Sequence, residues 1–156
     1  MKKIAIFADI QNIYYTCRQA YHRQFDYRAL YRRVAVLGEI TVANAYAIDR
    51  GDQGQRKFQN ALRQMGFTIK LKPYIQRSDG SAKGDWDVGI TIDVMKTAAH
   101  VDSIVLLSGD GDFDLLLESL ATDGIESQVY GVPSLTADSL INAAGSFHPI
   151  DERLLL

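Results

Sequence analysis

The chain has 156 residues, 47% of them hydrophobic and 23% charged, a composition that excludes a disordered protein and predicts one domain over residues 1–156. Its single cysteine, Cys17, excludes an intrachain disulfide and a zinc site built from cysteines. The net charge of −2 conceals an imbalance, because residues 1–83 contain 15 Lys and Arg against 6 Asp and Glu, whereas residues 84–156 contain 2 against 13. Such asymmetry indicates either a polyanionic partner or two solvated surfaces of opposite charge.

The first half of the chain alternates apolar runs with amphipathic segments, the pattern of a parallel sheet flanked by helices. An apolar run that ends at Asp9 predicts a buried strand. Asp26 is placed to cap a helix that ends at Gly38. In chain order we predict a strand at 4–8, helices at 13–24 and 27–37, a strand at 39–48, a helix at 54–65, a strand at 67–74 and a polar loop at 76–84.

The second half continues the same alternation. In chain order we predict a helix from 85 or 86 to about 100, a strand at 103–107, a turn at 108–112, a helix at 113–123, a strand at 126–130, a helix at 136–144 and a strand at 147–150. This order predicts an α/β fold with a central, mostly parallel sheet of five or six strands and helices on both faces. Ligands bind such sheets at the carboxyl ends of the strands.

Four aspartates lie where these strand ends and the nearby helix would bring them together: Asp9, Asp87, Asp110 and Asp112. Asp9 ends the first strand, and the Ser108–Asp112 turn follows the strand at 103–107. If these two strands are central neighbours, the carboxylates can converge on one side of the sheet. Glycines at 109 and 111 would let the turn hold them close together without Cβ clashes.

Carboxylates that close cannot all be ionised without compensation, so either some stay protonated or divalent cations lie among them. Oxygen ligands without His or Cys favour Mg²⁺ or Mn²⁺. Such a site would bind phosphate oxygens through the metal and activate a water for in-line attack on a phosphodiester. The alternative is structural, since a lone Asp at a strand end is more often a helix cap, and Asp85 and Asp114 are expected to act only as first-turn residues.

Several neighbouring residues have more than one possible role. Asn12 could orient Asp9, bind substrate or cap the first helix, and Lys83 could contact phosphate or be solvated. Asp93 lies about 240° around the helix from Asp87, so the two do not share a face. Three tyrosines are expected to pack partly in the core rather than stack on bases: Tyr14, Tyr15 and Tyr21.

The sequence lacks the motifs of several other kinds of site and of targeting or membrane segments. An EF-hand loop starting at Asp110 would need Gly where Leu115 stands and Glu where Ala121 stands. No glycine-rich dinucleotide or P-loop motif is present, so we expect no nucleotide cofactor. The opening apolar run is too short for a signal peptide, and no run approaches the roughly 20 residues of a membrane span, so we expect a cytoplasmic protein without a membrane partner.

Three motifs, in this order, resemble the signatures of the NYN domain family, and its LabA-like bacterial branch in particular. Residues 6–12 (IFADIQN) resemble the opening D-x-x-N strand. Residues 83–88 (KGDWDV), followed by Asp93, resemble the second signature, and residues 106–113 (LLSGDGDF) resemble the third, S-G-D-x-D-F. The resemblance covers nearly the whole chain.

The resemblance implies a PIN-like, three-layer αβα Rossmann-like fold and a Mg²⁺- or Mn²⁺-dependent ribonuclease site. By position it implies that four residues bind metal and act in catalysis: Asp9, Asp87, Asp110 and Asp112. The residues implied to support them are Asn12, Lys83, Asp93 and Ser108. One departure is Ile10, which stands where Gly is common and is expected to alter how closely substrate approaches.

The leading hypothesis is therefore a metal-dependent ribonuclease that hydrolyses RNA. The candidates for holding the RNA strand are Arg50, Arg56, Lys57, Arg77 and Lys83. One alternative is a non-catalytic RNA- or protein-binding regulatory protein that keeps a vestigial acidic site. Another is a phosphatase acting on small phosphoesters, since the same metal chemistry would serve.

Overall fold

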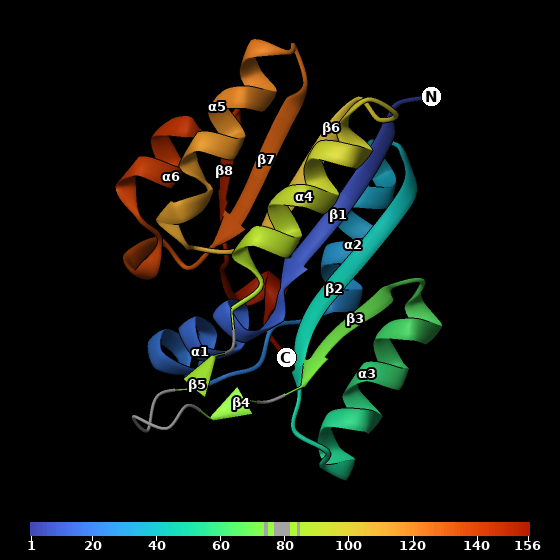
Figure 1. Ribbon diagram of the computed structural model, residues 1–156, viewed down its shortest axis with the longest axis vertical. Helices are drawn as coiled ribbons and strands as arrows, with labels where there is room; N and C mark the ends of the chain where they lie inside the picture. The colour runs from blue at the N-terminus through green and yellow to red at the C-terminus, as the bar shows by residue number, and fades with distance from the viewer. Residues whose placement is uncertain (74, 77–81, 84) are drawn as a thin grey trace.

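A six-stranded sheet, parallel throughout, runs through the middle of the molecule (Figure 1). The computed structural model describes residues 1–73, 75, 76, 82, 83 and 85–156, and side chains in 1–73 and 85–156. The strands are β1 (Lys3–Asp9), β2 (Glu39–Asp49), β3 (Thr68–Pro73), β6 (Ser103–Leu107), β7 (Glu126–Gly131) and β8 (Ser146–Pro149). Their order across the sheet is β3-β2-β1-β6-β7-β8. The predicted α/β fold with a parallel sheet of five or six strands is confirmed.

The strand order reverses between β1 and β6. The chain builds outward from β1 through β2 to β3 and then returns to the other side of β1 to start β6. Ala8 of β1 pairs with Leu107 of β6, so Asp9 and Ser108 follow at the same level. Because connections leave such a point in opposite directions, a crevice forms at the carboxyl ends of the two strands. The sheet topology therefore places the expected ligand site between Asp9 and the turn that begins at Ser108.

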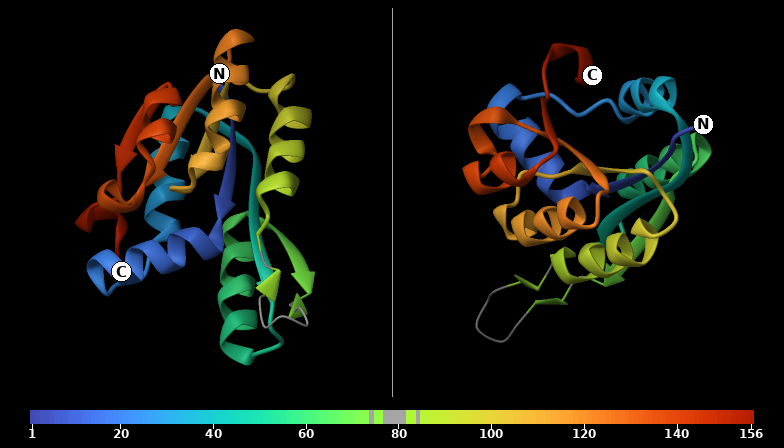
Figure 2. Two further views of the ribbon diagram at one scale, coloured as in Figure 1. Left: turned by 60° about the vertical axis from the view of Figure 1, so that its left-hand side comes forward. Right: turned by 90° about the horizontal axis from the view of Figure 1, so that it is seen from above.

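Helices cover both faces of the sheet (Figure 2), which makes three layers. One face carries α1 (Ile10–Tyr21), α2 (Tyr27–Leu37) and α3 (Gln53–Met65). The other carries α4 (Asp87–Ala98), α5 (Asp114–Thr122) and α6 (Asp138–Ala143). The alternation of β1 serves both layers, since Ile4 and Ile6 enter one core while Ala5 and Phe7 enter the other.

Most predicted boundaries agree with the structure to within a few residues. The helix predicted at 27–37 is α2, and the Asp26 carboxylate caps it by accepting the Ala29 N–H at 3.0 Å. The helix predicted at 13–24 begins earlier, at Ile10, and ends before His22, which has a φ of 55°. Its N-cap position is Asp9, whereas Asn12 lies inside the helix and its side chain accepts the Gly109 N–H.

Other segments differ from the prediction in kind. The predicted loop at 76–84 overlaps an antiparallel strand pair, β4 (Ile75–Gln76) and β5 (Ala82–Lys83), and its remaining residues lie outside those described. The helix predicted at 113–123 starts as a 3₁₀ turn, η1 (Gly111–Phe113), before α5. Two further 3₁₀ turns were not predicted, η2 (Pro133–Leu135) and η3 (Glu152–Leu154). In the described part of the chain, no helix has the length and apolarity to cross a bilayer.

Candidate active site

A cavity of about 420 Å³ opens at the carboxyl end of β1, at the reversal point of the strand order. Its acidic lining residues, which define the carboxylate cleft, are Asp9, Asp85, Asp87 and Asp110. They come from the end of β1, from the start of α4 and from the turn after β6. Asn12 of α1 and Arg50, just after β2, complete much of the wall. Residues more than 100 positions apart in the chain thus meet in one cavity.

Asp9 is the most buried of these carboxylates, with 9% of its surface exposed. The Ser108 hydroxyl donates to Asp9 Oδ2 at 3.1 Å. Burial is the largest cause that raises the pKa of Asp9, hydrogen bonds from Ser108 and the Asn12 backbone oppose the rise, and the charges of Asp110 and Asp85 add to it; together they raise the pKa to about 6. Asp9 is therefore a carboxyl group whose protonation changes close to neutral pH.

The turn after β6 is held rigidly by side chains on both sides of it. Ser108, which is fully buried, accepts the Asp110 N–H on its hydroxyl at 3.1 Å. Asp110 in turn accepts the Asp112 N–H at 2.9 Å. From α1, the Asn12 Oδ1 atom accepts the Gly109 N–H at 2.9 Å. Of the roles open to Asn12, the structure favours positioning, because its amide joins α1 to this turn.

The two glycines of the turn permit close packing against the segment that follows β7. A Cβ atom at Gly109 would lie 2.7 Å from the Leu135 carbonyl oxygen, and one at Gly111 would lie 2.9 Å from Ala137 Cβ. The Ala137 N–H also donates to the Gly109 carbonyl at 3.1 Å. The glycines therefore prevent a clash as expected, but the clash avoided is with residues 135–137 rather than between the carboxylates.

Asp87, Asp110 and Asp112 form the tightest acidic group. Each offers a carboxylate oxygen, and the three atoms lie within 4.8 Å of one another. Burial is the largest cause that raises the pKa of Asp87, and with the hydrogen bond and charge of Asp110 and the charges of Asp85 and Asp9 the pKa rises to about 8. Burial and the neighbouring carboxylates therefore both favour the protonated form of Asp87 at neutral pH.

Asp85 belongs to the cleft although the sequence analysis assigned it only a helix-end role. It lies before α4, its Oδ1 accepts the Asp87 N–H at 3.2 Å, and its charge raises the pKa of both Asp9 and Asp87. The signal for its role was present in the sequence, since Asp85 stands two residues before Asp87. A helix-end position and a cleft position are indistinguishable in the sequence, because the direction of the preceding segment decides between them.

Asp93 is placed away from the acidic group. It accepts hydrogen bonds from the Tyr46 hydroxyl and the Lys70 ammonium group, both at 2.7 Å. Despite some desolvation, these partners lower its pKa. Asp93 is not among the described residues that line the carboxylate cleft, and it ties α4 to β2 and β3. Lys83 belongs to β5, and its side chain lies outside the described part of the structure.

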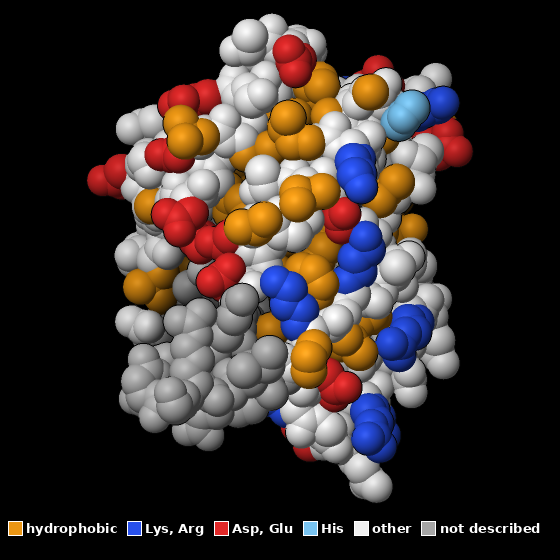
Figure 3. Space-filling model, viewed as in Figure 1, with side chains coloured by type: hydrophobic (Ala, Val, Ile, Leu, Met, Phe, Trp, Pro, Cys, Tyr) orange, Lys and Arg blue, Asp and Glu red, His pale blue; other side chains and the backbone are white. Residues whose placement is uncertain are grey.

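The basic residues expected to hold a strand are dispersed. Arg50 is exposed and lines the cleft. Arg56 and Lys57 are exposed on α3 but do not line it, and Arg77 lies outside the described residues. On the face drawn in Figure 3, most acidic side chains lie on the side of α5 and α6 and most basic ones on the side of β3 and α3.

The tyrosines of α1 divide into two groups. Tyr21 packs as expected and donates its hydroxyl to the Ile150 carbonyl at 2.6 Å. The expectation of core packing is wrong for Tyr14 and Tyr15, which are 43% and 49% exposed. The buried stripe of α1 is Ile10, Ile13 and Cys17, and these two rings lie beside it. Ile10, the departure from the family pattern, is thus a core residue.

The donor set fits a hard divalent cation. Oxygen ligands of one Mg²⁺ ion lie at most about 4.2 Å apart, twice the usual ligand distance, so the three oxygens within 4.8 Å need only a small adjustment. Burial and the neighbouring carboxylates raise the pKa of Asp87, so its negative charge is unfavourable in the protein alone. A divalent ion would supply that compensation, and the absence of His and Cys from the group disfavours zinc and copper.

Comparisons with known proteins cover nearly the whole chain. A family model described as NYN domain matches residues 3–151. The chain is 32% identical over 158 aligned positions to the low amplitude and bright protein LabA of Synechococcus elongatus, covering 96% of this chain and 84% of that protein. The crystal structure of a Vibrio parahaemolyticus protein of unknown function is 51% identical, with a TM-score of 0.94 and coverage of 99% and 96%.

A more distant structure shares the fold alone. Ribokinase from Giardia lamblia has a TM-score of 0.52 at 12% identity, over 97% of this chain and 58% of its own. That likeness shows a shared α/β fold and says nothing about the chemistry of this chain.

Proposed function

The chain belongs to the NYN domain family, and from this premise we propose that it is a metal-dependent ribonuclease. The family and the aspartate group together fit a nuclease, and the proposal extends this to hydrolysis of RNA phosphodiester bonds. The observation that carries it is the convergence of three carboxylate oxygens within 4.8 Å at the end of the central strands. Such an arrangement raises the pKa of Asp87, so it is costly unless it has a use.

The proposed ligands of Mg²⁺ or Mn²⁺ are Asp87, Asp110 and Asp112, with Asp9 on the buried side of the cleft. When bound, the ion would stabilise negative charge developing on the phosphate and lower the pKa of the attacking water. Asp110 is central to this arrangement, because its position is set by two hydrogen bonds within the turn. Asp85 would add negative charge at the rim and so favour cation binding.

The protein's own groups would position substrate and move a proton. Asp9 has a pKa of about 6, a value suited to a general base at neutral pH. The Ser108 hydroxyl holds Asp9 Oδ2 and the Asp110 amide at once, so it keeps these two residues in a fixed relation. Arg50 lies at the rim of the cleft, where a guanidinium can contact a phosphate beside the scissile bond.

The test uses purified protein, labelled single-stranded RNA and three conditions: Mn²⁺, chelator, and Mn²⁺ with Asp110→Asn. We expect cleavage with Mn²⁺ and a loss of at least about 100-fold in the other two, because removal of a ligand exceeds the 10–100-fold cost of losing an outer partner. Equal cleavage in all three would mean a contaminating nuclease and would end the proposal. Binding without cleavage would instead identify the non-catalytic regulatory protein.

Comparison of RNA with two other substrates, a phosphomonoester and single-stranded DNA, tests the class of reaction. We expect activity on RNA to exceed activity on a phosphomonoester such as p-nitrophenyl phosphate, because a nuclease must accept a diester with chain on both sides. Faster turnover of the monoester would favour the phosphatase. Equal cleavage of single-stranded DNA would contradict the assignment of RNA as substrate.

A further inference from the structure

A second cavity, of about 590 Å³, adjoins the carboxylate cleft. Four residues line both cavities: Gln11, Tyr15, Ile48 and Arg50. The second cavity lies between α1, the end of β2 and the start of α3, at the lower end of the sheet in Figure 1. We call it the aromatic groove after its lining rings, which include Tyr14, Tyr15 and Phe58. A chain-like ligand bound in the carboxylate cleft could therefore continue directly into this groove.

The aromatic groove presents rings and a cation in a fixed arrangement. Tyr14 and Tyr15 are 43% and 49% exposed, and their rings meet edge to face with centroids 5.3 Å apart. The Arg18 guanidinium lies 5.9 Å from the Tyr14 ring centroid and donates to the Tyr14 hydroxyl at 2.8 Å. Exposed tyrosines on a folded helix retain apolar faces in water, so a flat ligand that covers them gains free energy.

The opposite wall of the groove adds positive potential. Arg50 lies there, and its backbone N–H is held by the Gln55 side chain at 3.0 Å. The first turn of α3 also lines the groove, through Gly54 and Gln55. Asp52 lines it too, but its carboxylate already accepts the Gln55 N–H at 2.6 Å as the helix cap. Rings on one wall and guanidinium groups from both walls match a ligand of alternating bases and phosphates.

We propose that the aromatic groove binds single-stranded RNA beside the bond that is cleaved, with bases on Tyr14 and Tyr15 and phosphates near Arg18 and Arg50. The inference rests on the proposed function in that the strand leads into the carboxylate cleft. A duplex does not fit this recognition, because its bases already stack on one another and present no free face to the rings. The proposed groove therefore selects RNA that is unpaired where it binds.

The test measures binding separately from cleavage, by fluorescence anisotropy of a labelled 12-nucleotide RNA in Mg²⁺ on an Asp110→Asn background. Into this background we place Tyr14→Leu, which removes the ring, or Arg18→Gln, which removes the charge. Tyr14→Phe keeps the ring, and Arg63→Gln makes the same charge change on an exposed residue of α3 outside the groove. Circular dichroism checks that each variant is folded.

We expect Tyr14→Leu to weaken RNA binding at least about 5-fold, the lower limit for loss of one base-stacking ring. Arg18→Gln should also weaken binding and flatten its salt dependence, because one phosphate contact is lost. Tyr14→Phe should weaken binding less than Tyr14→Leu, because it keeps the ring and loses only the acceptor of the Arg18 hydrogen bond. Arg63→Gln should stay within about 2-fold of the background protein. Duplex RNA of the same sequence should bind more weakly than the single strand.

Three results would overturn the inference. The first is equal binding by all variants, and the second is an equal loss for Arg18→Gln and Arg63→Gln, which would indicate a general charge effect. The third is duplex binding as tight as single-strand binding. Hydrolysis of bis(p-nitrophenyl) phosphate by the parent protein with Mn²⁺ tests the nuclease separately. If that activity is absent while Tyr14→Leu still weakens binding, the nuclease proposal fails and the groove remains an RNA site.

Discussion

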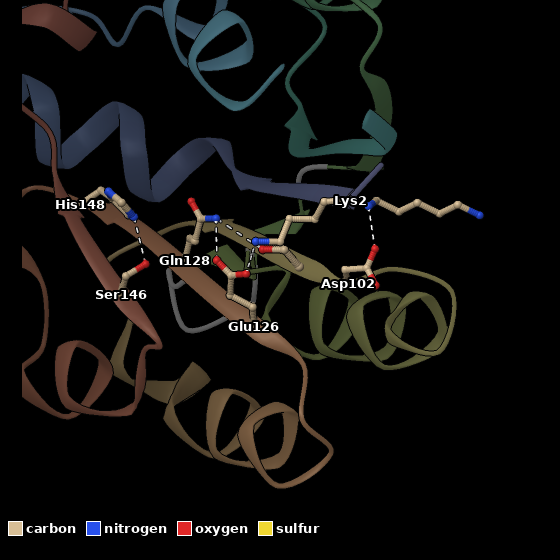
Figure 4. A network of polar contacts seen from close by, with 8 residues as sticks. Lys2, Asp102, Glu126, Gln128, Ser146 and His148 are labelled. Atoms are coloured by element: carbon tan, nitrogen blue, oxygen red, sulfur yellow. Dashed lines mark hydrogen bonds and ion pairs between the residues drawn. The ribbon is translucent and has the colours of Figure 1, made fainter. Parts of the chain in front are cut away.

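The two ends of the central sheet differ in how their acidic side chains are arranged. At the amino ends of the strands, Lys2 pairs with Glu126, and Asp102 accepts the Lys3 N–H at 2.8 Å (Figure 4). Gln128 extends this network by donating to Glu126 at 3.2 Å. At the carboxyl ends, the carboxylates of the cleft face one another instead. Acidic residues therefore occur at both ends. At the amino ends Glu126 pairs with the Lys2 ammonium group, whereas the donors to Asp9, Asp85 and Asp110 include a hydroxyl and two backbone N–H groups.

The difference shows which end is built for stability. A matched pair contributes to folding or is neutral, whereas burial, with the neighbouring carboxylates adding to it, raises the pKa of Asp9 to about 6 and of Asp87 to about 8, so ionising either group opposes folding. A protein keeps such a costly group where function requires it. Four measurements test this difference between the two ends of the sheet.

Metal binding should stabilise the carboxyl end strongly. At a Mn²⁺ concentration 100 times its own titration midpoint, linkage predicts a gain of about 2.7 kcal/mol, or roughly 5–10 °C in Tm for a chain of this length. Asp110→Asn should lose most of that gain because it removes a proposed ligand, whereas Glu126→Gln at the amino end should keep it. Differential scanning fluorimetry measures both. An unchanged gain in Asp110→Asn would show that the ion does not bind through Asp110 in the cleft.

The metal-free protein should lose stability as pH rises. In the unfolded chain an Asp has a pKa near 3.9, so between about pH 4 and pH 8 the folded state binds more protons through Asp87 than the unfolded state does. With chelator present, Tm should fall by roughly 2–4 °C between pH 6.5 and pH 8.5. Asp87→Asn should lack this decline. A parent protein equally stable at both values would contradict the raised pKa.

Two amide substitutions that each remove one negative charge should have opposite effects. Without metal, Asp110→Asn relieves repulsion on Asp87 and keeps an oxygen to accept the Asp112 N–H, so we expect a gain of about 1 kcal/mol. Glu126→Gln breaks the exposed pair with Lys2, so we expect a loss of about 0.2–1 kcal/mol. Urea unfolding measures both, and a loss for Asp110→Asn would make that residue a structural cap.

The smallest effect is expected for Asp102→Asn. The amide oxygen of Asn can still accept the Lys3 N–H, so stability should change by less than about 0.5 kcal/mol. RNA cleavage should stay at the parent rate, because Asp102 lies at the end of the sheet opposite the cleft. A large loss of activity would show that the two ends are coupled.

Much of the fold was predictable because its signals are local. The cap at Asp26 set the start of α2, and the continuous apolar run at 103–107 predicted β6 at its observed bounds. The strand-end rule directed attention to Asp9 and to the turn after β6. What remained ambiguous were residues with two local explanations, such as Asn12, where cap and tertiary bond look alike in the sequence.

The alternation of strands and helices, the edge of the sheet that would carry the site and the aspartates at that edge could all be read from the sequence. That Asp85 faces the cleft, that Asp93 pairs with Lys70, and that Tyr14 and Tyr15 are exposed in the aromatic groove became evident only from the folded chain. The two kinds of feature depend on interactions of different range. Periodicity and caps depend on neighbours within a few residues, whereas the partner of a side chain depends on strand order and on the rotation of each helix against the sheet.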